Sequence, residues 1–321
     1  MLKELIKIEK TPRKGLFALE WVVMGYLLFT TLFIIFASSR LHNMDAMLWG
    51  RLRVVATTLA VYVVYRLLPC RLTRLVRVVV QMALLSWWYP DTYELNRILP
   101  NLDHVFAQFD QTLFGCQPAL LFHQALPWHW FSELMDLGYA SYYPMIAVVA
   151  VYYYFCRYHE FQRAVFVIMG AFFIMYVMFI FIPVVGPTFY YHAVGVEDIA
   201  RGVFPDLQHY FEYHQECLAS PGWTDGFFYH LVEDAKAAGE RPTAAFPSSH
   251  VGVSTVLMLL AWRSKSRRLF FILLPLFVLL CFATVYIQAH YAIDALAGLL
   301  CGAALYFLLQ MGANAATNIE Q

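Results

Sequence analysis

The stretch AAFPSSHVGVSTVLMLLAWRSKSRRLFFILLPLFVLLCFATVYIQAHYAIDALA, residues 244–297, decides the fold. It contains the apolar runs 249–262 and 269–289, joined by a basic turn, and a third run starts at His290. Apolar runs of about 20 residues are typical of helices that cross the hydrocarbon of a bilayer. The stretch therefore predicts consecutive membrane helices, with His250 at the beginning of the first and His290 at the beginning of the third.

The composition of the whole chain points to the same class of protein. Of its 321 residues, 61% are hydrophobic and 14% are charged, and the mean hydropathy is +0.57. Soluble domains carry about 25% charged residues, so a soluble protein is excluded. Lysine plus arginine equals aspartate plus glutamate, 22 of each. With no basic excess to neutralise phosphates, a nucleic-acid partner is not expected.

The sequence predicts an all-α fold, a polytopic bundle of about eight transmembrane helices. Pro90 is expected to end the third apolar run. Short amphipathic pieces at 119–126 and 128–134 are expected to lie along the membrane surface, and residues 226–238 have the pattern of an amphipathic helix. The eight apolar runs are residues 16–38, 53–68, 75–89, 137–156, 164–185, 249–262, 269–289 and 290–311.

The placement of positive charge predicts the orientation of the bundle. Lysines and arginines concentrate in four short segments near residues 3–14, 66–77, 157–163 and 263–268, which places these segments and both termini in the cytoplasm. His250 and His290 then both lie on the outer face, and the lack of long loops favours a bacterial inner membrane. Cys116 and Cys217 lie in outer loops, where disulfides persist, so we predict a bridge between them.

Three ionisable side chains at the membrane edge suggest catalysis. His290 and Asp294 are four residues apart and share a helix face, so the carboxylate can hold one ring nitrogen protonated while the other attacks. His250 is a candidate acid, and Ser248 and Ser249 offer hydroxyls and a helix cap. Two helix N-termini could clamp one phosphate. The alternative is a set of headgroup-level polar residues, but convergence of three ionisable groups favours function.

Residues 245–250 (AFPSSH) and 290–294 (HYAID) resemble the second and third signature motifs of the type 2 phosphatidic acid phosphatase superfamily. The resemblance implies that His290 is the phosphate nucleophile, aided by Asp294, that His250 is the acid, and that Ser248 donates a hydrogen bond to phosphate. It implies no metal and no other cofactor. It covers residues 75–311, an expected six-helix catalytic core, with a two-helix extension at 1–74 and a short C-terminal tail at 312–321.

Departures from that pattern concern the cations that grip phosphate. The family's phosphatases carry Lys-x6-Arg-Pro before these motifs and Ser-Arg before the third-motif histidine, whereas this chain has PVVGPT at 183–188 and Ala283-Thr284. Arg241 lies nearby, but in a different loop. A monoester carries nearly two negative charges and a diester one, so the missing cations favour a diester. The same departures resemble the inositol phosphorylceramide synthase branch, which transfers headgroup phosphate from phosphatidylinositol to ceramide.

We therefore expect a phosphotransferase that moves a phosphoryl headgroup, most readily phosphoinositol, from a glycerophospholipid donor to a ceramide-like acceptor through a phosphohistidine. The alternatives are a lipid phosphate phosphatase, acting on phosphatidate or a prenyl diphosphate, and a non-catalytic membrane protein. Segment 186–246, rich in aromatic residues, reads equally as a lid that excludes water or as an interfacial belt. The candidate phosphate- or substrate-binding residues are Ser248, Ser249, Arg241, Tyr291 and Tyr190.

Overall fold

The computed structural model describes residues 2–319, and every named element in this range is a helix, which confirms the predicted all-α class. The short 3₁₀ helix η1 spans Tyr210–Glu212. The α-helices are α1 (Leu2–Leu5), α2 (Ala18–Phe36), α3 (Met44–Leu67), α4 (Arg71–Ala83), α5 (Leu85–Asn96), α6 (Asp103–Phe114), α7 (Pro118–Ala125), α8 (His129–Ala140), α9 (Tyr142–Cys156), α10 (Tyr158–Phe181), α11 (Pro187–Val194), α12 (Val196–Ala200), α13 (Phe227–Gly239), α14 (Ser249–Arg263), α15 (Arg267–Tyr286) and α16 (Ala292–Ile319).

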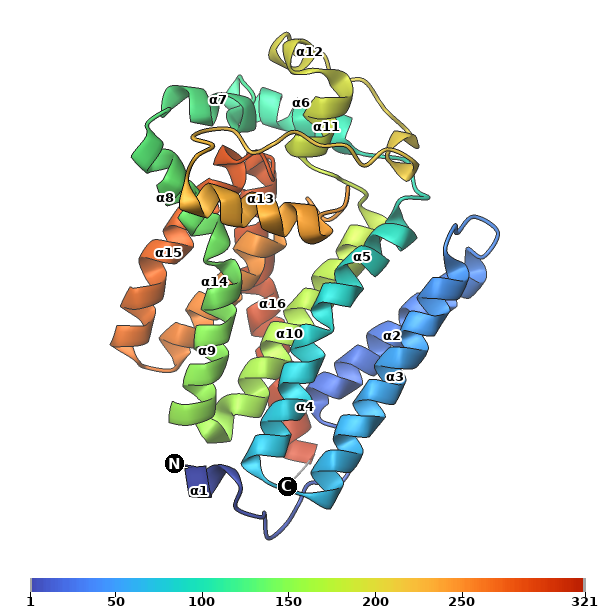
Figure 1. Ribbon diagram of the computed structural model, residues 1–321, viewed down its shortest axis with the longest axis vertical. Coiled ribbons are helices and arrows are strands. Elements are labelled where there is room, and N and C mark those ends of the chain that lie inside the picture. Colours follow the sequence, from blue (N-terminus) through green and yellow to red (C-terminus); the bar gives the residue numbers. More distant parts are fainter. Residues whose placement is uncertain (1, 320–321) are drawn as a thin grey trace.

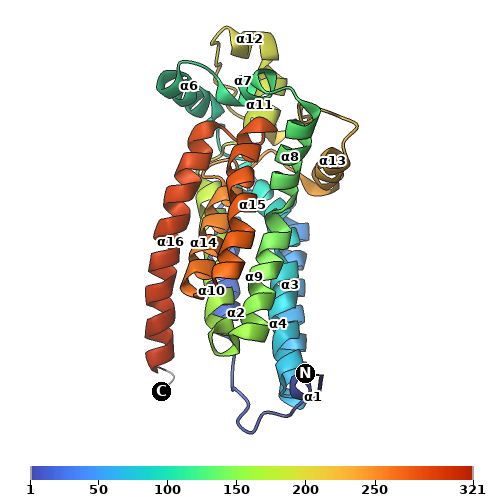
Figure 2. The ribbon, with the colours of Figure 1, turned by 90° about the vertical axis from the view of Figure 1, so that its left-hand side faces the viewer.

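The long helices run roughly parallel in one bundle, and several short ones gather at one of its ends (Figure 1). Helices α6, α7, α11, α12 and α13 form this cap, whereas α1 and the last turns of α16 lie at the opposite end (Figure 2). Helix α13 confirms the amphipathic helix predicted at residues 226–238. The chain therefore places the turns that begin α14 and α16 at the capped end.

Within residues 2–319, five helices are long and apolar enough to span a membrane, namely α2, α3, α10, α15 and α16. The pair α8 and α9, bent by 46°, brings the number to six if it is one span. This supports an integral membrane protein. The expected runs 75–89 and 249–262 lie on helices that are too short by this measure. Helix α14 has 15 residues, a length of about 22 Å against a hydrocarbon layer of about 30 Å. Most residues of α14 are buried inside the bundle, so the length of this helix need not match the thickness of the hydrocarbon layer.

Pro90 does not end a helix, contrary to the prediction. The helical run breaks at Leu84 instead, and α5 continues through Pro90 to Asn96. Proline removes one backbone hydrogen bond, but the turn that follows is held by tertiary contacts. Asp91 accepts two hydrogen bonds from Arg51 of α3, both 2.8 Å long and both buried. These contacts outweigh the local preference of the proline.

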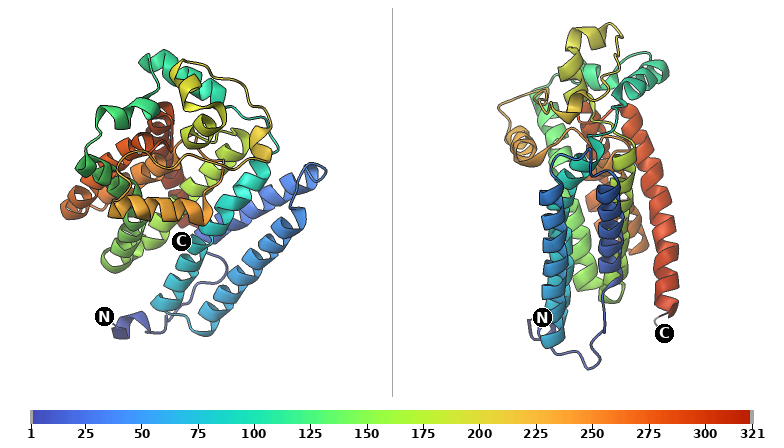
Figure 3. Two further views of the ribbon diagram at one scale, coloured as in Figure 1. Left: turned by 45° about the horizontal axis from the view of Figure 1, so that its top comes forward. Right: turned by 90° about the vertical axis from the view of Figure 1, so that its right-hand side faces the viewer.

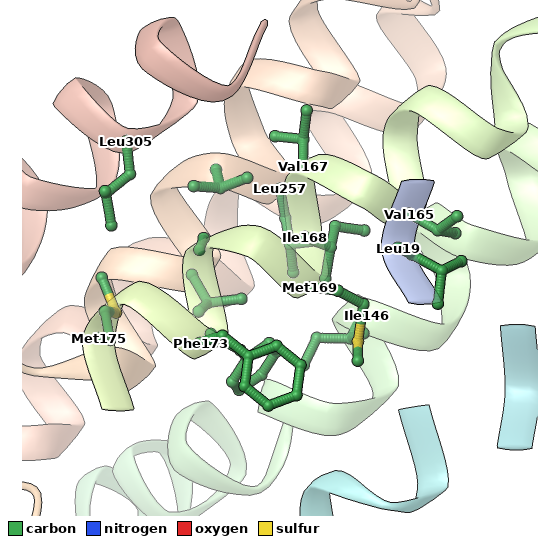
Figure 4. Close-up of a cluster of buried hydrophobic side chains, with 14 of the residues drawn as sticks. Leu19, Ile146, Val165, Val167, Ile168, Met169, Phe173, Met175, Leu257 and Leu305 are labelled. Carbon is green, nitrogen blue, oxygen red and sulfur yellow. The ribbon is translucent and has the colours of Figure 1, made fainter. Parts of the chain in front are cut away.

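Helix α10 is the centre of the hydrophobic core. Its residues from Val165 to Met175 face Leu19 of α2 and Ile146 of α9 on one side, and Leu257 of α14 and Leu305 of α16 on another (Figure 4). The α2–α3 pair stands at the flank of the bundle (Figure 3). It is joined to α4 by a fully buried ion pair between Glu20 and Arg77, in which Arg77 Nε donates to Glu20 Oε1 at 2.8 Å.

Helices α14 and α16 approach each other so closely that only glycine fits between them. A Cβ on Gly298 would lie 2.6 Å from the carbonyl oxygen of Ser248, and one on Gly302 would lie 2.2 Å from that of Gly252. Gly298 and Gly302, four residues apart on one face of α16, therefore serve packing within the chain. This contact sets the separation of the first turn of α14, which carries His250, and the turn before α16, which carries His290.

We expect Gly302→Ala to destabilise the protein by about 1–3 kcal/mol, because the added methyl group meets the backbone of α14 and the helices must separate. Gly312→Ala, on the same helix, is the matched control, because a Cβ at this position would meet no atom within 4 Å. Thermal unfolding in detergent measures both variants. Equal unfolding midpoints for the two would contradict the close contact.

Candidate active site

The structure brings His250 and His290 together, with ring centroids 5.7 Å apart. His250 lies in the first turn of α14, and His290 lies in the turn that connects α15 to α16. The backbone locks the two turns to each other, because the amide of Ser248 donates to the carbonyl of Asp294 at 3.0 Å. Both histidines therefore occupy one rigid site at the capped end of the bundle.

The hydrogen bond of His290 fixes which ring nitrogen is free. Its Nδ1 lies 2.8 Å from the carbonyl oxygen of Ala245, and a carbonyl can only accept, so Nδ1 carries the proton. In the neutral ring, Nε2 then holds a lone pair. Burial lowers the pKa of His290 to about 4, so the ring is neutral at pH 7. His290 is thus prepared to act as a nucleophile through Nε2.

Asp294 does not hold the Nδ1 proton in the way the sequence predicts. Its Oδ2 is 3.6 Å from Nδ1 of His290, beyond a hydrogen bond, and instead accepts from the amide of Tyr291 at 2.9 Å. The backbone carbonyl of Ala245 takes the orienting role because it lies 2.8 Å from Nδ1, whereas Asp294 lies 3.6 Å away. Asp294 is fully buried beside the ring, so its carboxylate is placed to stabilise positive charge that forms on His290.

His250 is held by aromatic rings. It stacks on Tyr139 at a centroid distance of 4.5 Å and packs against Tyr142 at 4.4 Å. Its Nδ1 is buried and has no hydrogen-bond partner among the described residues. The ring is therefore fixed in place, and its Nδ1 is not held by a hydrogen bond. An acid that gives up and recovers a proton requires such a free nitrogen.

Only one of the two helix N-termini is available to a phosphate, which corrects the expected double clamp. On α14, Ser248 Oγ caps the amide of Val251 at 3.4 Å, and the amides of Ser249 and His250 have no acceptor in residues 2–319. On α16, the first amides are already taken. Asp110 of α6 accepts from Ala292 at 2.8 Å and from Ile293 at 3.0 Å. A phosphate would meet a carboxylate there, so α14 is the anion-binding end.

Three of the expected substrate-binding side chains are engaged elsewhere. The hydroxyl of Tyr190 donates to the carbonyl of Pro205, and that of Tyr291 donates to Asp103; both rings are fully buried. Arg241 is half-buried and donates to the carbonyl of its neighbour Glu240. Tyr190 and Tyr291 therefore support the site from behind. Ser248 caps α14 and Ser249 is its first residue, next to His250 in the chain, and their binding of phosphate stays a prediction.

The sequence reading missed the segment that joins the two motifs. Val184 accepts from the amide of Ala245 at 3.0 Å, and Thr188 donates from its amide to the carbonyl of Gln288 at 2.9 Å. Between them, Gly186 adopts φ +91°, and a Cβ there would lie 2.6 Å from the carbonyl oxygen of Ala289. Gly186-Pro187 at the end of an apolar run is typical of a turn before a new helix, so the sequence does contain a signal for this turn.

The predicted disulfide is wrong. Cys116 and Cys217 are both free thiols. Cys116 lies in the turn after α6, next to Gly115, which ends that helix with a positive φ of 70°. Cys217 lies in the stretch that runs past α11, where the amide of its neighbour Leu218 donates to the carbonyl of Thr188. Location in outer loops alone did not bring the two together.

The buried state of His290 predicts an unusual pH profile. An exposed histidine nucleophile loses activity as the pH falls through about 6.5, whereas a pKa of about 4 keeps His290 neutral well below that. We therefore expect the limb of kcat/KM that reports this ring to fall only as the pH drops through about 4. Steady-state kinetics between pH 3.5 and 8 measure it, and a limb near 6.5 in the native protein that His250→Phe leaves in place would contradict a buried ring.

Comparison with known proteins places the chain in a family. No curated protein and no solved structure matches it. The family model of the PAP2 superfamily matches residues 104–308, from the first turn of α6 to the second half of α16. The match covers more than half of the chain and contains both histidines and Asp294. The protein belongs to the PAP2 superfamily.

Proposed function

We propose that the protein is a lipid phosphotransferase that moves a phosphoryl headgroup, most readily phosphoinositol, from a glycerophospholipid to a ceramide-like lipid. Membership of the PAP2 superfamily supports a phosphatase or phosphotransferase acting on lipids. The observation that carries the proposal is the geometry of His290. Its Nδ1 proton is tied to Ala245, so Nε2 is free to form a phosphohistidine next to His250.

The charges around the site favour a phosphodiester donor. Among the described residues, no lysine or arginine contributes to the pKa shift of either histidine. The buried carboxylates of Asp103, Asp110 and Asp294 act on one another behind His290. Such surroundings repel the nearly dianionic phosphate of a monoester more strongly than the single charge of a diester. This supports transfer from a phospholipid over hydrolysis of phosphatidate.

In the first step, Nε2 of His290 attacks phosphorus, and the bond from phosphorus to the diacylglycerol oxygen breaks. His250 gives a proton to that oxygen. Burial and the neighbouring His290 lower the pKa of the free ring to about 3, and the negative charge of the bound donor opposes this shift and favours the protonated ring. Asp294 stabilises the positive charge on His290, and the amides of Ser249 and His250 bind the phosphoryl oxygens. In the second step, His250 takes the proton of the acceptor hydroxyl, whose oxygen attacks phosphorus, and the electron pair of the phosphorus–nitrogen bond returns to Nε2.

Transfer requires that water be kept from the phosphohistidine. Segment 186–246, which includes α11, α12 and α13 of the cap, supplies a cover, and α13 is anchored to α8. Glu133 of α8 accepts from the amides of Phe228 and Tyr229 at the start of α13, at 3.2 and 3.1 Å. The same helix α8 carries Tyr139, on which His250 stacks. We propose that this cap excludes water during transfer.

The arrangement in the membrane is part of the proposal. We place both termini in the cytoplasm and the site on the outer face, in a bacterial inner membrane. Residues 75–311 form the catalytic core, and α2 and α3 belong to an N-terminal extension. The positive charges near residues 66–77 and 263–268 support this orientation.

The test uses purified protein in mixed micelles with labelled phosphatidylinositol, with and without ceramide, beside a reaction on phosphatidate. We expect phosphoinositol-ceramide and diacylglycerol in equal amounts over many turnovers when ceramide is present, and at most about one diacylglycerol per enzyme when it is absent. Phosphate release from phosphatidate without any use of ceramide would overturn the proposal in favour of the alternative, a lipid phosphate phosphatase acting on phosphatidate or a prenyl diphosphate. Family membership is compatible with both.

A further inference from the structure

Helix α6 presents two buried carboxylates, Asp103 and Asp110, to the turn that carries His290. They are seven residues apart, two helical turns, and therefore lie on one face of α6. Both are buried, and so is Ala107 between them, whereas Val105 and Phe109 on another face are about half exposed. A surface helix does not bury two acids without reason, because each ionised carboxylate must be compensated by donors.

Asp110 satisfies the N-terminus of α16. Its two oxygens accept from the amides of Ala292 and Ile293, one bond each. These amides lie two and three residues after His290. The contact joins positions 182 and 183 residues apart, so it is a tertiary bond and not a local cap. A carboxylate at this end of α16 is also favoured by the helix dipole.

Asp103 binds the same turn and the segment behind it. Its Oδ1 accepts from the hydroxyl of Tyr291 at 3.0 Å and from the amide of Gly186 at 2.9 Å. Its Oδ2 accepts from the amide of Val185 at 2.7 Å. Asp103 thus links Tyr291, the neighbour of His290, to segment 184–188. That segment binds Ala245, whose carbonyl accepts the Nδ1 proton of His290.

We propose that Asp103 and Asp110 are positioning residues for the nucleophile, which hold the turn of residues 290–293 so that Nε2 of His290 points at the phosphorus. This rests on the proposed phosphotransferase function. Neither residue touches the substrate, and both act through the backbone and Tyr291. Displacement of a reacting group by about 1 Å costs on the order of 100-fold in rate. Loss of these anchors must therefore appear in kcat and leave substrate binding at α14 unchanged.

The experiment compares Asp110→Asn, Asp110→Ala and Asp103→Asn with Gln108→Ala, a control on the exposed side of α6. Asparagine keeps one acceptor of Asp110, and alanine keeps none. We expect kcat per folded enzyme to fall about 10-fold in Asp110→Asn and about 100-fold in Asp110→Ala, with KM within about twofold of the native value. If the two aspartates served stability alone, the variants would unfold at lower temperature but would not show this graded fall in kcat.

Two readouts need no lipid substrate. Hydrogen exchange by mass spectrometry reports the amides of Ala292 and Ile293, which are expected to exchange at least about 10-fold faster in Asp110→Ala. The rate of carbethoxylation by diethylpyrocarbonate reports the exposure of Nε2 of His290. If these rates change but the native protein turns over no lipid, the proposed function fails and the ordering of the turn stands. If neither rate changes, or if kcat is unaffected while lipid turnover proceeds, the positioning role is overturned.

Discussion

Replacing His290 by asparagine is expected to abolish lipid turnover, with kcat lowered by about 10⁵-fold or more, because the variant has no atom that can bond to phosphorus. Asparagine is the informative replacement. Its side-chain amide can donate to the carbonyl of Ala245 in place of Nδ1, so the turn keeps the bond that the native ring makes. Release of diacylglycerol from labelled phosphatidylinositol measures the effect.

The control for this variant is its folding. The unfolding midpoint of His290→Asn is expected to stay within a few degrees of the native value, because the buried hydrogen bond is kept. A folded variant that retains more than about one per cent of native turnover would contradict a covalent role for His290. It would leave the geometry of the site intact and point to direct attack by the acceptor lipid.

Replacing His250 by phenylalanine is expected to lower kcat by about 10²–10⁴-fold, because the departing diacylglycerol oxygen then finds no acid. Phenylalanine keeps the packing against Tyr139 and Tyr142, so the loss reports the ring nitrogens rather than the stacking. The loss is expected to shrink for a donor whose leaving group is a more acidic alcohol, since such an oxygen needs no proton. An equal loss for both donors would contradict a role as the acid.

The pairing of His250 with His290 could be predicted from the sequence because each stands at the start of an apolar run, and the charge pattern predicts that both runs start on the same side of the bundle. The partners that orient them could not. The acceptor of the Nδ1 proton is a backbone carbonyl, that of Ala245, and every residue has one, so no side-chain pattern marks it. Asp110 reaches Ala292 across 182 residues, and only the folded cap brings α6 onto α16.

The fold class followed from composition and periodicity, whereas the lengths of individual helices depended on packing. The proline at position 90 is tolerated inside α5 because Asp91 is paired with Arg51 from a distant helix, which a local rule does not include. Helix α14 is shorter than a membrane span because its neighbours bury it. Tertiary contacts therefore determine both the continuation of α5 through Pro90 and the length of α14, and local sequence patterns predict such contacts poorly.

The most direct test of the account is a search for the covalent intermediate. Native protein is mixed with phosphatidylinositol in the absence of ceramide, quenched in alkali within milliseconds to seconds, digested and analysed by mass spectrometry. We expect a phosphoinositol group on His290 and on no other histidine, and we expect it to disappear when ceramide is added before the quench. Full turnover with ceramide but no adduct on His290 at any time would contradict it.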